Sequence, residues 1–313
     1  MSSLKEASKW NRPYEVPDPE AFTNYQREIY SAFRAPIFSV KPSEWEALAR
    51  KAVPAANFGY VFGSASSQKT YASNLAAFDR YRLRPSMLVD ATRRDLSVNL
   101  FGTTHKSPIL VAPVGVQNIM HSDAEEATAR ACEKLGVPMV LSTAATRTIE
   151  QVAQANGNGD RWYQLYWPKP QDEAITVSLL NRAKANGYKV LVVTLDTFTL
   201  GWRPDDLDHS YLPFLWGEGC QIGLSDPVFN EKYAEMQAKD TRSASEKLSE
   251  AWSLIKRNGT PYGALRVLGN AATIAKARAW LDVINSGTYR EWPDRAEGHP
   301  DRGRCTQGYR VWN

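Results

Sequence analysis

From residue 107 onward, short apolar runs alternate with segments that have the period of an amphipathic helix. The predicted strands are 109–114, 138–142, 161–166 and 189–196. The predicted helices between them are 123–135, 148–154 and 172–186. Strands that are apolar almost throughout, and that are joined by helices, indicate a parallel sheet covered on both faces. A doubly wound sheet and a (β/α)8 barrel both fit this pattern.

The expected helix ends have their own sequence signals. A Ser or Thr followed three residues later by Glu or Gln predicts a capping box. Such pairs are Ser43 with Glu46, Ser122 with Glu125, and Thr148 with Gln151. Gly136 and Gly187 are expected to close two helices, and Pro54 to end the helix that begins near Ser43. The stretch up to about residue 100 is therefore interpreted as helices and connectors, and helices are expected again after Asp226.

Composition and charge exclude several classes of protein. The 313 residues are 43% hydrophobic with a mean hydropathy of −0.45, and no apolar run reaches the roughly 18 residues of a membrane helix, so no membrane partner is expected. The net charge of +4 is spread along the chain, which argues against nucleic acid as a partner. Neither a secretory signal nor a disulfide framework is indicated, because the start has no apolar segment and the three cysteines lie far apart. A cytoplasmic location is therefore expected, and no metal site.

Polar residues follow successive predicted strands at their carboxyl ends, where barrel enzymes place their sites. They are Ser142, Gln164 and Tyr166, and Thr194 and Asp196. Residues two apart on a strand face the same side, so one face offers an amide, a phenol, a hydroxyl and a carboxylate. These groups suit a flat heteroaromatic ligand with carbonyl and ring N–H edges. Taken singly, a polar residue at a strand end more often forms its hydrogen bonds within the protein than with a ligand.

Arg203 follows these strands in the run LGWRP. Its guanidinium is suited to bind a substrate carboxylate through two parallel hydrogen bonds. An ion pair with Asp205, Asp206 or Asp208 is an equally good interpretation.

Several long motifs occur together and in a fixed order. They are PILVAPVGVQ (108–117), ATARACEKLGVPMVLSTAATRTIEQVA (127–153), WYQLYWP (162–168), VVTLDTFTLGWRPDDLD (192–208) and SDPVF (225–229). With these motifs the chain resembles the FMN-dependent α-hydroxy-acid dehydrogenase/oxidase family, over about residues 25–292. The W-R-P-x-D-L-D run is similar to the lactate 2-monooxygenase-like branch. The resemblance implies a TIM barrel that binds FMN and oxidises a small L-2-hydroxy acid, with the flavin accepting the α-hydrogen and its electrons.

The resemblance also implies roles for individual residues. Backbone beside the flavin ring is implied for Pro113, Val114 and Gly115, and contacts with the ring edge for Ser142, Gln164 and Thr194. By the same likeness Tyr60 binds the substrate carboxylate, Arg203 is the mobile arginine that approaches the substrate, and Tyr166 is the active-site tyrosine.

Other family motifs have no counterpart in the sequence. None of the histidines, His105, His121, His209 and His299, stands in the family's S-N-H-G-G-R context. The second arginine of that motif, the fifth-strand lysine and the Gly-rich phosphate-binding segment are also missing. The expected fold is therefore an incomplete TIM barrel of about four βα units, truncated at its C-terminal side, whose FMN binding and turnover are impaired.

The expected organisation has four parts. They are an N-terminal helical segment (1–100), the first half of the barrel (101–228), a helical insertion or lid (229–292) and an irregular tail (293–313). A half barrel has open strand edges, so self-association is expected. Two alternatives remain open. One is a truncated, non-catalytic chain that associates with itself or with a full-length relative. The other is an aldolase or isomerase, for which Lys189 and Asp196 are weak candidates.

Overall fold

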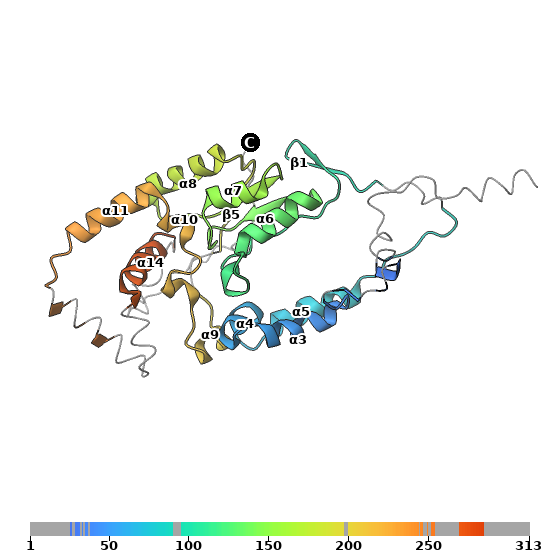
Figure 1. Ribbon diagram of the computed structural model, residues 1–313, viewed down its shortest axis with the longest axis horizontal. Coiled ribbons are helices and arrows are strands. Elements are labelled where there is room, and N and C mark those ends of the chain that lie inside the picture. The colour runs from blue at the N-terminus through green and yellow to red at the C-terminus, as the bar shows by residue number, and fades with distance from the viewer. Residues whose placement is uncertain are drawn as a thin grey trace, which may run out of the picture. The chain divides into compact units, whose positions relative to one another are not determined.

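The computed structural model describes most of the chain between residues 38 and 284. The described residues are 26, 29–31, 33, 35–36, 38–89, 95–196, 200–243, 245–246, 249, 252–253 and 269–284. The predicted tail 293–313, and much of the predicted insertion 229–292, lie outside them. The chain divides into two units, Met1–Pro54 and Ala55–Asn313. Figure 1 labels the helices and strands for which the view has room.

The first unit contains helix α3, Pro42–Ala52. Its N-cap is Lys41, so the capping box predicted at Ser43 is wrong. Pro42 is the reason, because its fixed φ suits the first helical position and places Ser43 inside the helix. The helix ends before Pro54, as predicted.

The second unit begins with helices α4, Ala55–Phe62, and α5, Lys69–Ala77, followed by the 3-10 helix η1, Phe78–Arg80. An antiparallel hairpin then pairs β1, Val98–Leu100, with β2, Thr103–His105. The sequence interpretation, helices and connectors up to residue 100, is wrong here. The turn residues Phe101 and Gly102 both have positive φ, of 51° and 79°, which is the geometry of a two-residue hairpin turn.

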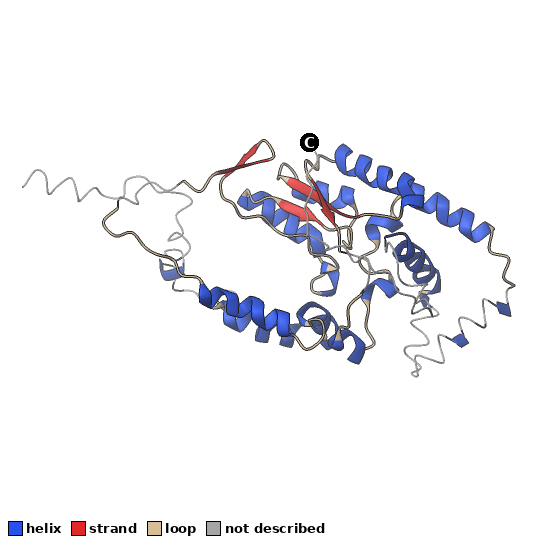
Figure 2. Ribbon diagram, turned by 180° about the vertical axis from the view of Figure 1, so that it is seen from behind, coloured by secondary structure: helices blue, strands red, loops and turns tan. Residues whose placement is uncertain are grey.

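Three parallel strands form a sheet in the order β3, β4, β5. They are Met139–Leu141, Arg161–Tyr166 and Leu191–Thr194. Strands are drawn in red in Figure 2. The predicted strand 109–114 is present only as a single parallel bridge from Val111 to Met139. Pro108 and Pro113 explain this difference, because neither can donate a backbone hydrogen bond to extend the ladder.

Helices connect the strands as predicted. The 3-10 helix η2, Gln117–Ile119, and α6, Ala124–Leu135, precede β3; α7, Ile149–Asn156, precedes β4; η3, Pro170–Asp172, and α8, Glu173–Ala185, precede β5. The capping box of Thr148 and Gln151 is confirmed, and Gly136 closes α6 in the left-handed conformation with φ 65°. The box predicted at Ser122 is wrong. The N-cap of α6 is Asp123, and Glu125 turns inward instead of capping its own helix.

After β5 the described residues contain helices and no further strand. These are α9, Pro204–Asp208, η4, Pro213–Trp216, α10, Gln221–Leu224, α11, Pro227–Ala238, and α14, Ala271–Ile284. Phe229 of α11 and the fully buried Trp280 of α14 meet edge to face, with ring centroids 5.3 Å apart. Both belong to the same hydrophobic core as the strands. No helix among the described residues is long and apolar enough to cross a membrane.

Alternate residues of the strands enter two separate cores. Met139, Leu141, Tyr163 and Leu165 pack in the larger core, which α6, α7 and α8 also line. On the other face Val140, Trp162 and Val190 form a small cluster with Leu100, Leu110 and Val192. Because the side-chain period of a strand is two, Ser142, Gln164 and Thr194 have the parity of this second face.

Candidate functional site

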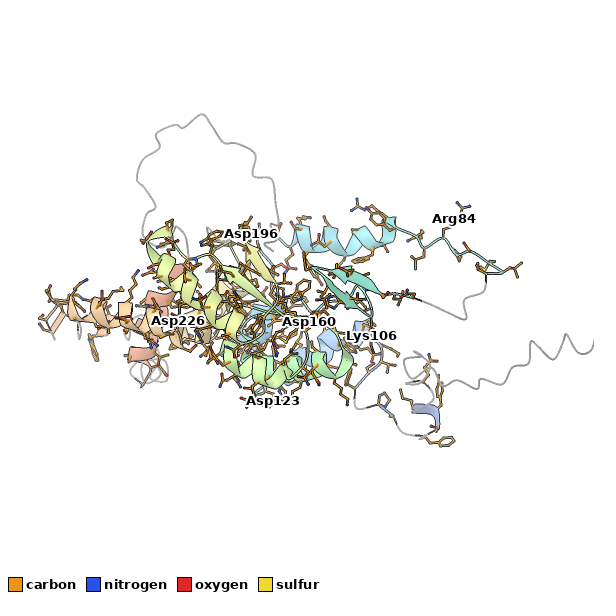
Figure 3. All side chains as sticks on the ribbon, turned by 90° about the horizontal axis from the view of Figure 1, so that it is seen from above. Arg84, Lys106, Asp123, Asp160, Asp196 and Asp226 are labelled. Carbon is orange, nitrogen blue, oxygen red and sulfur yellow. The ribbon has the colours of Figure 1, made fainter. Side chains whose placement is uncertain are left out.

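Ser142, Gln164 and Thr194 form one hydrogen-bonded chain across the carboxyl ends of the three strands. The Ser142 hydroxyl donates to Gln164 Oε1 at 3.3 Å, and Gln164 Nε2 donates to Thr194 Oγ1 at 2.8 Å. Asp196, just after β5, and Asp160, just before β4, mark the two ends of the sheet in Figure 3. The structure therefore brings together the three side chains that the sequence predicted for a flavin edge.

Thr143 fixes the orientation of Gln164, and the sequence reasoning missed it. Its backbone N–H donates to Gln164 Oε1 at 3.0 Å, and its hydroxyl donates to the Gln164 carbonyl at 2.6 Å. Gln164 is 1% exposed, so its amide cannot exchange these partners for water. The signal was weak because Thr143 is one of several hydroxyl residues in the run STAATRT (142–148).

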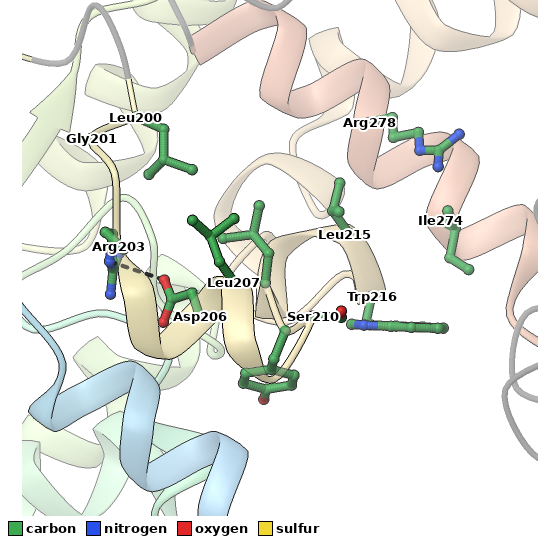
Figure 4. Close-up of a pocket in the computed structure, with 12 residues that line it drawn as sticks. Leu200, Gly201, Arg203, Asp206, Leu207, Ser210, Leu215, Trp216, Ile274 and Arg278 are labelled. Carbon is green, nitrogen blue, oxygen red and sulfur yellow. Dashed lines mark ion pairs between the residues drawn. The ribbon is translucent and has the colours of Figure 1, made fainter. Parts of the chain in front are cut away.

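Tyr60 and Arg203, from α4 and the residue before α9, lie against one another. The Arg203 guanidinium carbon is 4.7 Å from the centre of the Tyr60 ring, and Nη2 donates to the Tyr60 carbonyl at 3.0 Å. Burial raises the pKa of the Tyr60 phenol, against the opposing charge of Arg203. The ion pair expected for Arg203 is also present, with Nε 2.9 Å from Asp206 Oδ2 (Figure 4). Burial raises the pKa of Asp206, and Arg203 opposes this shift.

Tyr166 is the last residue of β4. Burial, and then the negative charge of Asp196, raise the pKa of its phenol. Tyr166 itself contributes to the raised pKa of Tyr60, so the two phenols lie within electrostatic reach of one another. Both phenols are therefore protonated at neutral pH and available as hydrogen-bond donors.

Pro113, Val114 and Gly115 form the segment that follows the Val111 bridge. A side chain on Gly115 would place its Cβ 2.7 Å from the carbonyl oxygen of Ala144, so glycine is required for this approach. The Val116 N–H donates to the same carbonyl at 2.9 Å. The structure thus joins this backbone to the loop that carries Ser142.

A cavity of about 380 Å³ lies beside Arg203 (Figure 4). Arg203 and Asp206 form part of its wall, and Ile274 and Arg278 of α14 contribute another part. The remaining lining residues are mostly apolar: Leu200, Gly201, Leu207, Ser210, Tyr211, Leu212, Leu215 and Trp216. Sequence reasoning did not anticipate this cavity, because α14 is distant from Arg203 along the chain.

The histidines of the described part have partners of their own. His105 lies at the amino end of the sheet, 3.6 Å from Asp160, and His209 Nδ1 is 2.8 Å from the Asp205 carbonyl. His121 accepts a hydrogen bond from the Asp123 N–H, and His299 is outside the described residues. Among the described residues, no three His, Cys, Asp or Glu side chains are grouped as a metal site.

The described residues fit the ring of FMN. Ser142, Gln164 and Thr194 are neutral donors and acceptors in one row, which suits the carbonyl and ring N–H edge of a flavin. Gly115 packs against the Ala144 carbonyl, whereas Pro113 and Val114 are exposed, so the exposed part of this segment is available to lie along a flat ring. The three neutral side chains do not compensate the charge of the phosphate.

Comparison with known proteins agrees with this geometry. Residues 49–257 match the family model described as FMN-dependent dehydrogenase. The chain is 45% identical over 225 residues to an FMN-dependent alpha-hydroxy acid dehydrogenase of Penicillium citrinum, covering 71% of this chain and 56% of that protein. It is 39% identical over 169 residues to human 2-hydroxyacid oxidase 1, covering 54% of this chain and 45% of that one.

The fold is similar to that of solved flavoenzyme barrels. A lactate oxidase of Pediococcus acidilactici superposes with a TM-score of 0.54 at 28% identity, over 57% of this chain and 49% of that one. The expected incomplete TIM barrel is thereby confirmed as the fold class, and the doubly wound alternative is set aside. The chain spans about half the length of the relatives it matches. The family model matches 209 residues, and the names of the relatives agree with it. The polar row at the strand ends is consistent with both findings. The chain belongs to the FMN-dependent dehydrogenase family.

Proposed function

We propose that this chain contributes the flavin-edge and substrate-carboxylate parts of a site that oxidises a small, lactate-like L-2-hydroxy acid. The observation that supports this most is the hydrogen-bonded row of Ser142, Gln164 and Thr194 at the carboxyl ends of parallel strands. Relatives named L-lactate oxidase and glycolate oxidase match the chain over 59% of its length, which favours a small hydroxy acid as the substrate class.

Each residue then has a role that follows from its chemistry. When bound, FMN would accept the α-hydrogen and the two electrons of the substrate, and the hydroxyl proton would go to a base that we assign to none of the described residues. Ser142, Gln164 and Thr194 hold the ring edge and fix its orientation. Arg203 binds the substrate carboxylate with the N–H groups that Asp206 and Tyr60 leave available. The protonated Tyr166 donates a hydrogen bond to the substrate.

We further propose that the 313-residue polypeptide alone binds FMN weakly and turns over slowly. The row of Ser142, Gln164 and Thr194 supplies no positive charge for the FMN phosphate. No histidine of the described part is hydrogen-bonded to any of these three side chains. The cytoplasmic location expected from cysteine usage stays a prediction, which imaging of a tagged chain would test.

Flavin titration of the 313-residue polypeptide tests the proposal. FMN fluorescence should be quenched saturably, and Gln164→Leu should weaken binding at least about tenfold, which corresponds to about 1.4 kcal/mol. Gln154→Leu, on the exposed face of α7, is the matched control and should bind as the parent does. Absence of saturable quenching, or equal binding by Gln164→Leu, would refute the flavin site. Rapid lactate oxidation with stoichiometric flavin would refute the proposed impairment.

A second candidate is a non-catalytic chain that associates with a copy of itself. The outer edge of β5 pairs with no strand among the described residues, and Leu195 just beyond it is 55% exposed. An unpaired edge of this kind favours strand addition. Sedimentation at several concentrations should show a dimer that Leu195→Lys weakens. A concentration-independent monomer would exclude this candidate.

A further inference from the structure

The Glu125 carboxylate is buried at a junction between two loops. It is 1% exposed, although it stands in the first turn of α6, where an acidic side chain usually faces solvent. Oε1 accepts hydrogen bonds from the backbone N–H groups of Thr146 at 2.9 Å and Gln117 at 3.2 Å. Oε2 accepts from the Thr146 hydroxyl at 2.6 Å. One side chain thereby holds the loop after the Val111 bridge and the loop after β3.

Gln117 carries this connection to the backbone beside the proposed flavin ring. Its Oε1 accepts from the Thr128 hydroxyl, one turn further along α6, at 2.7 Å. That contact turns the amide so that Nε2 donates to the Val114 carbonyl at 2.9 Å. The direction of the Val114 peptide is therefore set from α6, through Gln117.

The second loop is tied in at the same place. The Val116 N–H donates to the Ala144 carbonyl at 2.9 Å, and the Ala144 N–H donates to Ser142 Oγ at 3.1 Å. Thr146, which Glu125 holds twice, lies two residues beyond Ala144. Glu125 thus connects the Val114–Gly115 backbone with the residue that begins the polar row.

The local backbone shows that this placement is specific. Ala124, directly before Glu125, has a φ of 48°, in the left-handed region that alanine adopts only when its surroundings impose it. The predicted capping box at Ser122 is absent, so the carboxylate does not serve its own helix. Turning the Glu125 side chain inward therefore strains the backbone at Ala124 and leaves the N-terminus of α6 without a side-chain cap. The three hydrogen bonds that Glu125 accepts from the two loops offset this loss of stability.

We infer that Glu125 is a positioning residue that holds the Val114–Gly115 backbone and the Ser142 loop in the relative placement that receives the flavin ring. This inference rests on the proposed function. Glu125 does not touch the ring itself. It acts through Gln117 on one loop and through Thr146 on the other.

Three variants of the full chain separate this role from simple stability. Glu125→Gln keeps the size but replaces an acceptor by an amide N–H. Thr128→Val breaks only the alignment of Gln117. Glu126→Gln is the matched control, since Glu126 is the next residue and pairs with Arg147 at 3.3 Å on the half-exposed side of α6.

Amide hydrogen exchange and FMN titration are measured on all three. Glu125→Gln should speed exchange at Gln117 and Thr146 about tenfold, and Thr128→Val should leave the Thr146 amide as in the parent. Both should weaken FMN binding at least about tenfold and change the shape of the bound flavin's visible spectrum. Glu126→Gln should match the parent in every measurement.

The two measurements keep the inference distinct from the proposed function. Unchanged exchange in Glu125→Gln would overturn the inference, whatever the flavin does. Faster exchange with unaltered FMN affinity and spectrum would show that Glu125 serves stability only, and would also overturn it. If the parent chain fails to bind FMN, the proposed function fails, and the flavin role of Glu125 falls with it. Exchange still decides whether Glu125 joins the two loops.

Discussion

Replacing Gln164 by leucine tests how strongly the polar row depends on its central amide. Leucine is apolar and close in size, so the change removes hydrogen bonds with little change in packing. The Thr143 N–H would lose its acceptor at 3.0 Å, and the Ser142 hydroxyl would lose its acceptor at 3.3 Å. Both residues are buried, at 0% and 4% exposure, so water cannot replace the missing partner.

The magnitude follows from the two buried donors. A buried donor without a partner costs about 1–3 kcal/mol. The Ser142 hydroxyl recovers part of this by rotating, while the backbone N–H of Thr143 cannot move. We therefore expect Gln164→Leu to lower the free energy of unfolding by about 2–4 kcal/mol, a large share of the 5–15 kcal/mol typical of a domain.

Urea denaturation followed by far-UV circular dichroism measures this change. The midpoint should fall while the slope m stays constant, since the surface exposed on unfolding is unaltered. Gln154→Leu on α7 should remain within about 0.5 kcal/mol of the parent chain. A loss of less than 1 kcal/mol for Gln164→Leu would show that the amide is not the acceptor these buried donors need.

Three further predictions concern other parts of the chain. Arg203→Leu leaves Asp206 without its cation and raises its pKa further, so stability should fall by about 1–3 kcal/mol at pH 7. In urea denaturation the loss should shrink as the pH falls below the ordinary Asp pKa of 3.8, because Asp206 is then protonated in the folded and the unfolded state and needs no cation. Gly223→Ala would place a Cβ against the indole ring of Trp280, so thermal unfolding should show a loss of about 1–3 kcal/mol, whereas Gly269→Ala, with open space around it, should be near neutral. Burial, and then the charge of Glu218, raise the pKa of the Cys220 thiol to about 12, so mass spectrometry at pH 8.5 should find it unlabelled by iodoacetamide in the folded chain and labelled after unfolding. The thiol ionises at a lower pH in the unfolded chain than in the folded chain, so Cys220 also makes the folded state less stable as pH rises from about 8.5 towards 12. Labelling of Cys220 in the folded chain would contradict the burial of its thiol.

Strand and helix positions were the part of the fold that the sequence predicted best. Apolar runs separated by amphipathic segments located β3, β4 and β5, because the pattern reports burial directly. The same pattern overstated 109–114, where Pro108 and Pro113 limit the ladder to one bridge. It missed the β1–β2 hairpin, whose strands are only three residues long and whose turn is Phe-Gly instead of Asn-Gly.

Capping motifs were less reliable than periodicity. The pair at Thr148 formed a box, whereas Ser43 was displaced by a proline and Glu125 was drawn into a tertiary contact. A two-residue capping motif reflects only the local preference of the backbone. A buried N–H or hydroxyl donor from elsewhere in the chain can bind the same carboxylate and outweigh that preference.

The site was predictable where residues lie on strands. Strand parity placed Gln164 on one face, and chain order placed Ser142 and Thr194 beside it. Thr143 and Glu125 could not be predicted in this way. Their partners depend on how loops fold back, and neither spacing nor composition reports that.

The hydrophobic core on the helix side and the polar row on the other side share the same three strands. Tyr163 and Leu165 point one way, and Trp162 and Gln164 point the other. Alternate residues of the same strands therefore serve different purposes: one set fills the larger hydrophobic core, and the other set includes the side chains proposed to contact the ligand. A substitution on one face leaves the side chains of the other face in place, although the buried polar row itself also contributes to folding free energy through the hydrogen bonds that Gln164 accepts.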